Sequence, residues 1–333
     1  MTYGHGGYLP SGEAPSARTA VADDPLMLSP DGPAVVAIGG GHGLAAALEA
    51  VQLYAGKVTA VVSVADDGGS SGRLIQGLSI PAPGDIRRCL LALTPEPTLV
   101  SELFAYRFSA GDVMDHSLGN LMLAALTDLY GDFGAAVDAA GRMLGALGEV
   151  IPATTSPVGL RARIDGETVE GQVSISRLRG RIEAMELSPP DPQPNLRALE
   201  AIASADQVVI GPGSLFTSVI AALVVPDLAK VVMASGARRV FVCNLVTQDG
   251  ETWSLDGPGH IEALSRLGGV EGPGTIVVHD GHLAVPPGHS RIDLSQPPPG
   301  GWEVVRADVA DPTADWPAHD PFALAQVLET LVP

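Results

Sequence analysis

Three adjacent glycines, a histidine and a fourth glycine could bind an anion through their backbone. They follow the apolar run 34–38 and precede an Ala-rich segment with helical spacing. Bare glycine backbone lets a phosphate approach closely, and the amides at a helix N-terminus attract negative charge. The alternative is a tight turn with no ligand. The loop lacks the Lys-Ser/Thr pair of a P-loop, which argues against ordinary ATP or GTP hydrolysis. The predicted binding residues here are Gly39, Gly40, Gly41, His42 and Gly43.

A second polar loop, residues 65–73, follows the next apolar run, 58–64. Two carboxylates, two hydroxyls, bare backbone and a guanidinium suit a ligand with many oxygens, such as a sugar or a phosphate. The two carboxylates could also bind Mg²⁺, or they could cap the amides of their own loop. The predicted ligand contacts are Asp66, Asp67, Gly68, Gly69, Ser70, Ser71 and Arg73.

Two helix starts add polar side chains to this picture. In "PAPGDIRRC" we expect Arg87 to reach back toward loop 65–73, although Asp85 near a helix N-terminus is also explained by the helix dipole. In "HSLGN" Ser117 is placed as an N-cap. Gly119 in the first turn costs the helix about 1 kcal/mol relative to Ala, which favours a close approach there. We therefore expect Asn120 to contact a ligand.

A third glycine loop, "GPGSLFTS", repeats the strand–glycine–helix pattern in the second half of the chain. Ser214 can cap the helix, and the amides of Leu215 and Phe216 predict a second anion site. Two such loops in one sheet favour a diphosphate held from both sides. The predicted contacts are Gly211, Gly213, Ser214 and Leu215, together with Asn244, whose carboxamide either reads the ligand or satisfies its own loop.

Composition excludes several classes of partner. The 333 residues carry 19 basic and 38 acidic side chains, a net charge of −19 that repels nucleic acid and anionic membranes. Two distant cysteines argue against a disulfide framework or a zinc site. No apolar run approaches 18 residues and no signal peptide is evident. We expect a soluble cytoplasmic protein that does not insert into membranes.

The elements predict a doubly wound, Rossmann-like α/β fold. Residues 1–33 have the composition of a disordered tail, and residues 34–333 form one domain. Buried parallel strands are expected at 34–38, 58–64, 207–210, 239–244 and 275–280. Helices are expected at 44–54, in an insertion over about 84–147, at 215–225 and at the C-terminus. Alternation around Asp165-Gly166 predicts a hairpin flap, about 157–176, and 281–320 should be a loop with two short edge strands. Ligands of such sheets bind beyond the carboxyl ends of the strands.

The loops taken together resemble those of the YvcK, or gluconeogenesis factor, proteins, which are sisters of the CofD 2-phospho-L-lactate transferases. The motifs "GGGHG", "VADDGGSSGR", "PAPGDIRRC", "HSLGN", "GPGSL-TS" and "CNL-TQ-GET" stand in the order typical of that family. The resemblance covers about residues 34–280 and continues weakly to the "HDP" at 319–321 and the last helix. It implies a Rossmann-like fold, a cytosolic location, binding of UDP-N-acetylglucosamine or a related UDP-sugar, and a link to cell shape on gluconeogenic carbon sources. His42, Phe216 and the stretch 253–260 depart from the family pattern.

Two hypotheses follow from these observations. In the first, the protein is a non-enzymatic regulator of cell-wall synthesis that binds a UDP-sugar, requires no cofactor and acts on another protein. In the second, it is a CofD-like transferase that moves a phosphorylated, nucleotide-linked group to a small acceptor, with Mg²⁺ on Asp66 or Asp67. A nicotinamide-dependent dehydrogenase is disfavoured, because Leu44 stands where the third glycine of its fingerprint would be. Apolar, Ala-rich helices predict a dimer.

Overall fold

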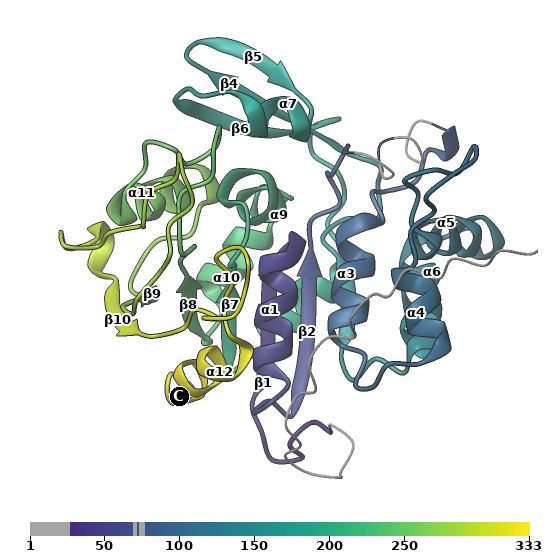
Figure 1. Cartoon of the computed structure of the whole chain (residues 1–333), viewed down its shortest axis with the longest axis horizontal. Coiled ribbons are helices and arrows are strands. Elements are labelled where there is room, and N and C mark those ends of the chain that lie inside the picture. The colour runs from purple at the N-terminus through teal and green to yellow at the C-terminus, as the bar shows by residue number, and fades with distance from the viewer. Residues whose placement is uncertain (1–26, 69–71, 73–76) are drawn as a thin grey trace, which may run out of the picture.

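A parallel sheet forms the centre of the protein. The structure is a computed structural model that describes residues 27–68, 72 and 77–333. Within these residues the sheet has seven strands in the order β10-β9-β8-β7-β1-β2-β3 (Figure 1). Neighbouring strands all run parallel. The strands are β1 (Ala34–Gly39), β2 (Lys57–Val62), β3 (Glu149–Pro152), β7 (Gln207–Ile210), β8 (Arg238–Val242), β9 (Thr275–His279) and β10 (Glu303–Ala307).

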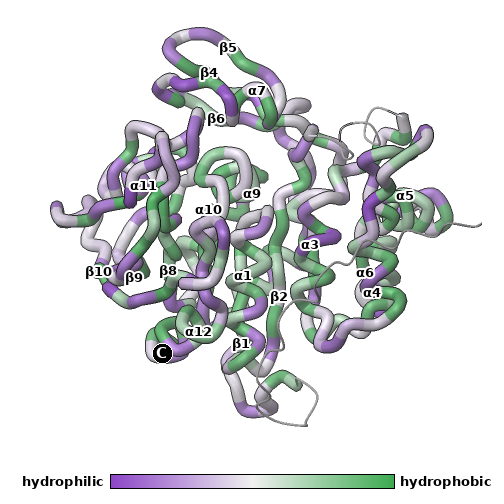
Figure 2. The backbone as a smooth tube through the Cα atoms, viewed as in Figure 1, coloured by the Kyte–Doolittle hydropathy of each residue, from purple (hydrophilic) through white to green (hydrophobic). Residues whose placement is uncertain are grey.

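Continuous apolar runs explain why these segments are central strands. β1 and β7 are buried along nearly their whole length, which requires apolar side chains on both faces of the sheet. Figure 2 shows apolar residues along β1, β2 and helix α1 (Gly41–Val51). The five strands expected from sequence are confirmed. β3 was not expected, since it is only four residues long and follows directly on a helical stretch.

The order of the strands creates a switch point between β1 and β7. From β1 the chain passes through α1 to β2 and later to β3, moving along the sheet in one direction. From β7 it passes to β8, β9 and β10 in the other direction. Right-handed crossovers in opposite directions place their helices on opposite faces, so the predicted doubly wound fold is confirmed. The crevice where two such halves diverge is the usual ligand site of this architecture.

Among the described residues, the long connection between β2 and β3 contains the helices α3 to α6. They are α3 (Gly84–Ala92), α4 (Leu99–Ala105), α5 (Leu118–Tyr130) and α6 (Phe133–Leu144), and they occupy the helical insertion expected over about 84–147. α3 packs directly on α1 and belongs to the layer that covers the sheet. α4 and α5 lie farther out, on the right of Figure 1, and α6 packs on the edge strand β3. Of these described helices, α3 lies nearest to β1 and the glycine loop that follows it.

A small antiparallel sheet lies above the carboxyl ends of the strands (Figure 1). It contains β4 (Gly159–Ile164), β5 (Glu167–Glu170) and β6 (Ile182–Ser188), in the order β5-β4-β6. The hairpin turn at Asp165-Gly166 is confirmed. The expectation that the hairpin runs to 176 is wrong, because Gln172–Arg177 forms helix α7. The chain turns at Gly171, whose φ is +91°, and buries Ile175, so this segment cannot continue β5. We call β4, β5, α7 and β6 the flap.

The second half of the chain contributes shorter helices. The helix expected at 215–225 begins as the π-helix η1 (Leu215–Ile220) and continues as α9 (Ala221–Leu223). The C-terminal helix is confirmed as α12, and of the two edge strands expected within 281–320 the structure contains β10. α12 spans Pro321–Thr330. Helices that were not expected are α8 (Leu196–Ala203), α10 (Leu228–Ala234), α11 (Gly257–Gly268) and the short 3-10 turn η2 (Pro299–Gly301).

The chain before β1 is partly held to the domain. Residues 1–26 of the expected tail lie outside the described residues. Ser29 donates from its backbone to Ala55 O, and Gly56 donates to Pro33 O, so the stretch next to β1 is tied to the loop before β2. Among the described residues, no single helix has the length and apolar character to cross a membrane. The two segments Leu215–Leu223 and Leu228–Ala234 reach that length only together, across a bend of 76°.

Candidate functional site

A cavity of about 600 Å³ opens at the switch point. Its floor is made by the loops after β1 and β7, and its walls come from the loop after β8, the start of α3 and the flap. A further wall comes from residues 316–319, which lie far along the chain just before α12. The volume is in the range of cavities that hold small-molecule ligands and cofactors. The two glycine loops that the sequence singled out therefore face one shared cavity.

The loop after β1 presents the N-terminus of α1 to this cavity. Gly40 is the N-cap and has no side chain with which to cap the helix. Gly41, His42 and Gly43 line the cavity, as the sequence predicted, whereas Gly39 is buried beneath them. A Cβ on Gly43 would lie 2.7 Å from the backbone carbon and oxygen of Pro212. Glycine is required at position 43 because the two loops touch there.

A buried ion pair lies against this glycine loop. The Asp85 carboxylate is 6% exposed, bonds Arg88 at 2.5 Å and accepts a hydrogen bond from the Gly41 amide. Burial raises the pKa of Asp85, and the charge and hydrogen bond of Arg88 lower it in part. Both side chains line the cavity. Burial, followed by the charges of Arg88 and Arg87, lowers the pKa of His42, so its imidazole is neutral near pH 7.

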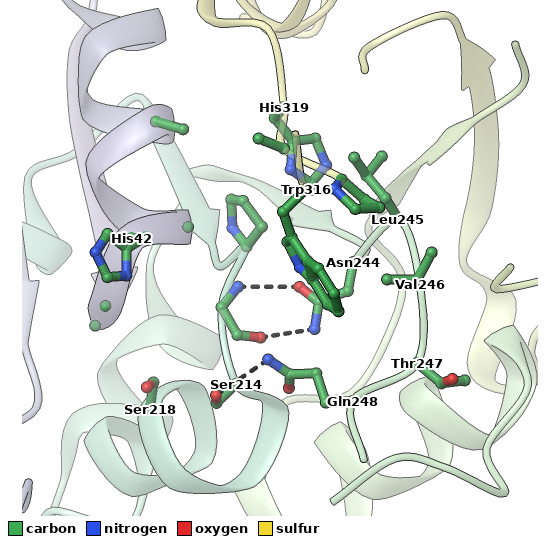
Figure 3. Close-up of a pocket in the computed structure, with 18 of the residues that line it drawn as sticks. His42, Ser214, Ser218, Asn244, Leu245, Val246, Thr247, Gln248, Trp316 and His319 are labelled. Carbon is green, nitrogen blue, oxygen red and sulfur yellow. Dashed lines mark hydrogen bonds between the residues drawn. The ribbon is translucent and has the colours of Figure 1, made fainter. Parts of the chain in front are cut away.

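The loop after β7 is locked in place by Asn244. The Asn244 carboxamide accepts from Gly213 N–H at 3.1 Å and donates to Gly213 O at 2.8 Å (Figure 3). Gly213 has φ of +151° and Gly211 has φ of +69°, conformations that favour glycine. Gly213, Ser214 and Asn244 line the cavity, and Gly211 does not. Asn244 therefore satisfies the backbone of the neighbouring loop after β7, and not that of its own loop after β8.

The second anion site expected at Leu215 and Phe216 is corrected by the structure. Glu251 Oε2 accepts from the amides of Phe216 at 3.3 Å and Thr217 at 3.4 Å. Its Oε1 accepts from the Thr217 hydroxyl at 2.6 Å. Leu215 is buried and does not line the cavity. A carboxylate of the chain itself fills this helix N-terminus, so an anion in the cavity would meet chiefly the loop after β1.

The two acidic residues of the loop after β2 point to different partners. Asp66 lines the cavity, and its Oδ1 accepts from the Gly68 amide at 2.9 Å, the capping role considered for it. Asp67 Oδ1 accepts from the Val173 amide at 3.0 Å and thereby caps α7 of the flap. The pair does not converge on a single Mg²⁺, although Mg²⁺ is commonly held by one carboxylate plus ligand phosphates.

Other residues of this loop add little to the cavity. Gly68 does not line it. Within the described ranges, no group of three or more His, Cys, Asp or Glu side chains is arranged to hold a metal ion. The remaining predicted contacts, Gly69, Ser70, Ser71 and Arg73, lie outside the described residues.

Arg87 and Asn120 are placed away from the cavity. Arg87 Nε donates to Asn120 Oδ1 at 3.1 Å, and its guanidinium donates to Phe104 O at 3.4 Å. Arg87 is 7% exposed and Asn120 is 3% exposed. A Cβ on Gly119 would lie 2.5 Å from Phe104 O, so close packing of α4 on α5 explains that glycine without a ligand. Neither Arg87 nor Asn120 lines the cavity, and Arg88, one residue on, faces it instead. Part of loop 65–73, toward which Arg87 is expected to reach, lies outside the described residues.

Several lining residues were missed by the sequence reasoning. Trp316 is 54% exposed although it lines the cavity, and Figure 3 shows it beside Asn244 and across from His42. His319 lies next to it and is 9% exposed. Both come from a Pro-rich stretch that was read as loop. A Trp within a Pro-rich loop stretch, in a chain with only three, was the available signal.

Comparison with known proteins places the chain among related sequences. Residues 35–293 match the family described as 2-phospho-L-lactate transferase CofD. A putative gluconeogenesis factor from Nostoc is 47% identical over 72% of this chain, and the match spans about half (53%) of that relative. The gluconeogenesis factor of Bacillus subtilis is 37% identical over 90% of this chain and 98% of its own length. A crystal structure from Bacillus halodurans has a TM-score of 0.84 and 34% identity, and covers 91% of this chain and 100% of its own.

Proposed function

Because the chain belongs to the CofD-like family that includes the gluconeogenesis factors, we propose that it binds a UDP-sugar, UDP-N-acetylglucosamine, in the cavity at the switch point. The observation that carries this proposal is the meeting of the two glycine loops over one cavity of about 600 Å³. A switch-point cavity at the N-terminus of a helix whose N-cap is a glycine is a favourable place for a diphosphate.

Local charge supports an anionic ligand despite the net charge of −19. The N-terminal amides of α1 and the Arg88 guanidinium supply positive potential beside the glycine loop. Asp85 offsets part of it, since its carboxylate bonds both groups. A diphosphate that competes with Asp85 for Arg88 and for the Gly41 amide would displace that ion pair. We expect the raised pKa of Asp85 to assist by making its neutral form more accessible.

The flap suggests how binding of the ligand in the cavity could be signalled to another protein. Asp67 holds the start of α7 on one side of the cavity, and the Arg179–Asp249 ion pair holds the flap on the other, at 2.7 Å. Gln172 of α7 also lines the cavity. A ligand that contacts this side chain would change the position of the flap, and a protein of cell-wall synthesis would read the altered surface during gluconeogenic growth. The proposed role is regulatory.

Isothermal titration of the full chain with UDP-N-acetylglucosamine tests this proposal. We expect binding by the wild type, and Arg88→Gln should weaken it about tenfold or more, because charge-assisted hydrogen bonds contribute roughly 1.5–3 kcal/mol. Arg88→Lys should retain part of the affinity. Arg163→Gln, which breaks an exposed ion pair on the flap, is the matched control and should leave affinity unchanged. Absence of heat with the wild type at millimolar ligand would refute the proposal.

A second proposal is a CofD-like transferase, favoured by the family match and by the buried carboxyl of Asp85 at the cavity wall. In this case Arg88 and the amides of α1 would neutralise charge on the phosphate of the nucleotide-linked donor, and Asp66 would be the residue nearest to any bound Mg²⁺. Phosphorus NMR of the chain mixed with a nucleotide-linked donor, Mg²⁺ and small hydroxy-acid acceptors distinguishes the two proposals. Release of the free nucleotide that requires the acceptor would favour the transferase.

A further inference from the structure

The cavity has two chemically different ends on either side of the glycine loops. Because β7 and β1 are neighbours, the loops after them occupy the middle, with β2 on one side and β8 on the other. On the β2 side, the lining residues are Asp66, Asp85, Arg88 and Gln172, which are all polar. On the β8 side, the apolar or aromatic residues Leu245, Val246, Trp316 and Pro317 line the cavity together with polar ones, Asn244, Thr247, Gln248, Asp249, His289 and His319. This side therefore offers an aromatic surface next to uncharged polar groups, which suits a planar ring with a polar edge.

Trp316 supplies a large aromatic surface on the β8 side of the cavity. Its indole is 54% exposed and lies beside Asn244 in Figure 3. The edge of His289 packs against it in a T-shaped contact, with ring centroids 5.0 Å apart. His289 is fixed in turn by a hydrogen bond of 2.6 Å between Nδ1 and Thr247 O. The indole is thus supported on one side while a broad part of it remains open to a planar group.

Two buried polar atoms of residues that line the cavity on the β8 side have no hydrogen-bond partner among the described residues. One is Gln248 Oε1, whose amide makes one bond, from Nε2 to Ser214 Oγ at 3.2 Å. Reversing the amide would only exchange which end is unpaired. The other is Nε2 of His319, a residue that is nine-tenths buried. Its other ring nitrogen bonds the Cys243 backbone, and burial lowers its pKa to about 4, so the neutral ring presents an acceptor at Nε2.

We propose that Trp316 stacks on the base of the nucleotide, with Gln248 and His319 recognising its polar edge. This inference rests on the proposed nucleotide binding and adds to it which end of the cavity takes the base. The sugar then lies on the polar β2 side, under Gln172 of the flap. A planar heterocycle with both donors and acceptors satisfies an aromatic face and two unpaired polar atoms together. A hexose at this end would stack only a C–H face on the indole, and it would leave the carboxylates of the β2 side without hydroxyl partners.

Titrations with three probes test this assignment on the full chain: UDP-N-acetylglucosamine, UDP and inorganic diphosphate. Base–aromatic stacking contributes about 1–3 kcal/mol per base, or roughly 5- to 150-fold in affinity. Trp316→Ala should weaken UDP and UDP-N-acetylglucosamine by a factor in that range and leave inorganic diphosphate unchanged. Trp316→Phe should restore most of the affinity. Trp253→Ala, at a Trp of similar exposure (46%) outside this cavity, is the matched control.

Each outcome decides between the possibilities. If the wild type binds UDP but Trp316→Ala binds it equally well, the base does not stack on Trp316, while the proposed function stands. If Trp316→Ala weakens only the sugar-bearing ligand, the hexose occupies this end and the assignment is reversed. If the wild type binds neither nucleotide, the proposed function fails and this inference fails with it. Quenching of indole fluorescence by UDP, lost in Trp316→Phe but retained in Trp253→Phe, would support the assignment independently.

Discussion

Replacing Gly43 by Ala should destabilise the protein, although a Gly-to-Ala change within a helix usually stabilises it. Gly43 lies in the first turn of α1, where Ala is preferred over Gly by about 1 kcal/mol. Its new Cβ would lie 2.7 Å from Pro212 C and O and 2.8 Å from Gly213 N, all backbone atoms. Overpacking of this kind costs about 1–3 kcal/mol. Because all three close neighbours are backbone atoms that cannot rotate away, the upper part of this range, about 2–3 kcal/mol, applies. Less the gain of about 1 kcal/mol in helix propensity, Gly43→Ala should lower the free energy of unfolding by about 1–2 kcal/mol.

The matched control is Gly141→Ala in α6. A Cβ there meets only Leu90 Cδ2, at 3.5 Å, which is an ordinary contact. The same substitution should therefore raise the free energy of unfolding by about 0.4–1 kcal/mol. Urea denaturation at constant m-value measures both, so the two variants are predicted to shift in opposite directions.

The substitution should also affect ligand binding. Separating the loops after β1 and β7 forces a bridging diphosphate to draw them together again, and 1–2 kcal/mol corresponds to about 5- to 30-fold in affinity. Titration with UDP-N-acetylglucosamine measures this loss, and Gly141→Ala should bind normally. A Gly43→Ala variant as stable as the wild type would refute the close contact between the loops, whatever its affinity.

Two further predictions concern buried charged groups. Arg87→Met should lower the free energy of unfolding by about 1–3 kcal/mol, because it removes the hydrogen-bond donor to Asn120 Oδ1 and Phe104 O. The Kd for the nucleotide should stay unchanged. A loss of affinity without a loss of stability would instead show that Arg87 contacts the ligand. Burial raises the pKa of Glu251 in the native state above its ordinary value of 4.5. At a pH between the ordinary and the raised pKa, the unfolded state has released a proton that the native state retains. The free energy of unfolding therefore falls as the pH rises from 4.5 through the raised pKa. Glu251→Gln should lack this fall, because its side chain does not titrate. We therefore expect the free energy of unfolding of the wild type minus that of the variant, measured by urea titration, to be smaller at pH 7 than at pH 4. An equal difference at both pH values would contradict this expectation.

Local sequence patterns determined the architecture and the glycine loops. Central strands bury both faces, so runs such as "AVVAI" and "QVVI" identify them without knowledge of their neighbours. A glycine run between such a strand and a helix has few local solutions, which is why Gly41, Gly43 and Gly213 reach the cavity as predicted. The family resemblance also depends on short ordered motifs and is borne out by the comparisons.

Only the tertiary structure decided which polar groups face the ligand space. Arg87 and Arg88 are adjacent in α3, and successive helix positions point about 100° apart, so the packing of that helix on α1 selects Arg88. Glu251 fills the N-terminus of η1 from 34 residues along the chain, and Trp316 comes from farther still. Such long-range contacts depend on how the elements dock, and the sequence pattern around each residue carries no record of its distant neighbour.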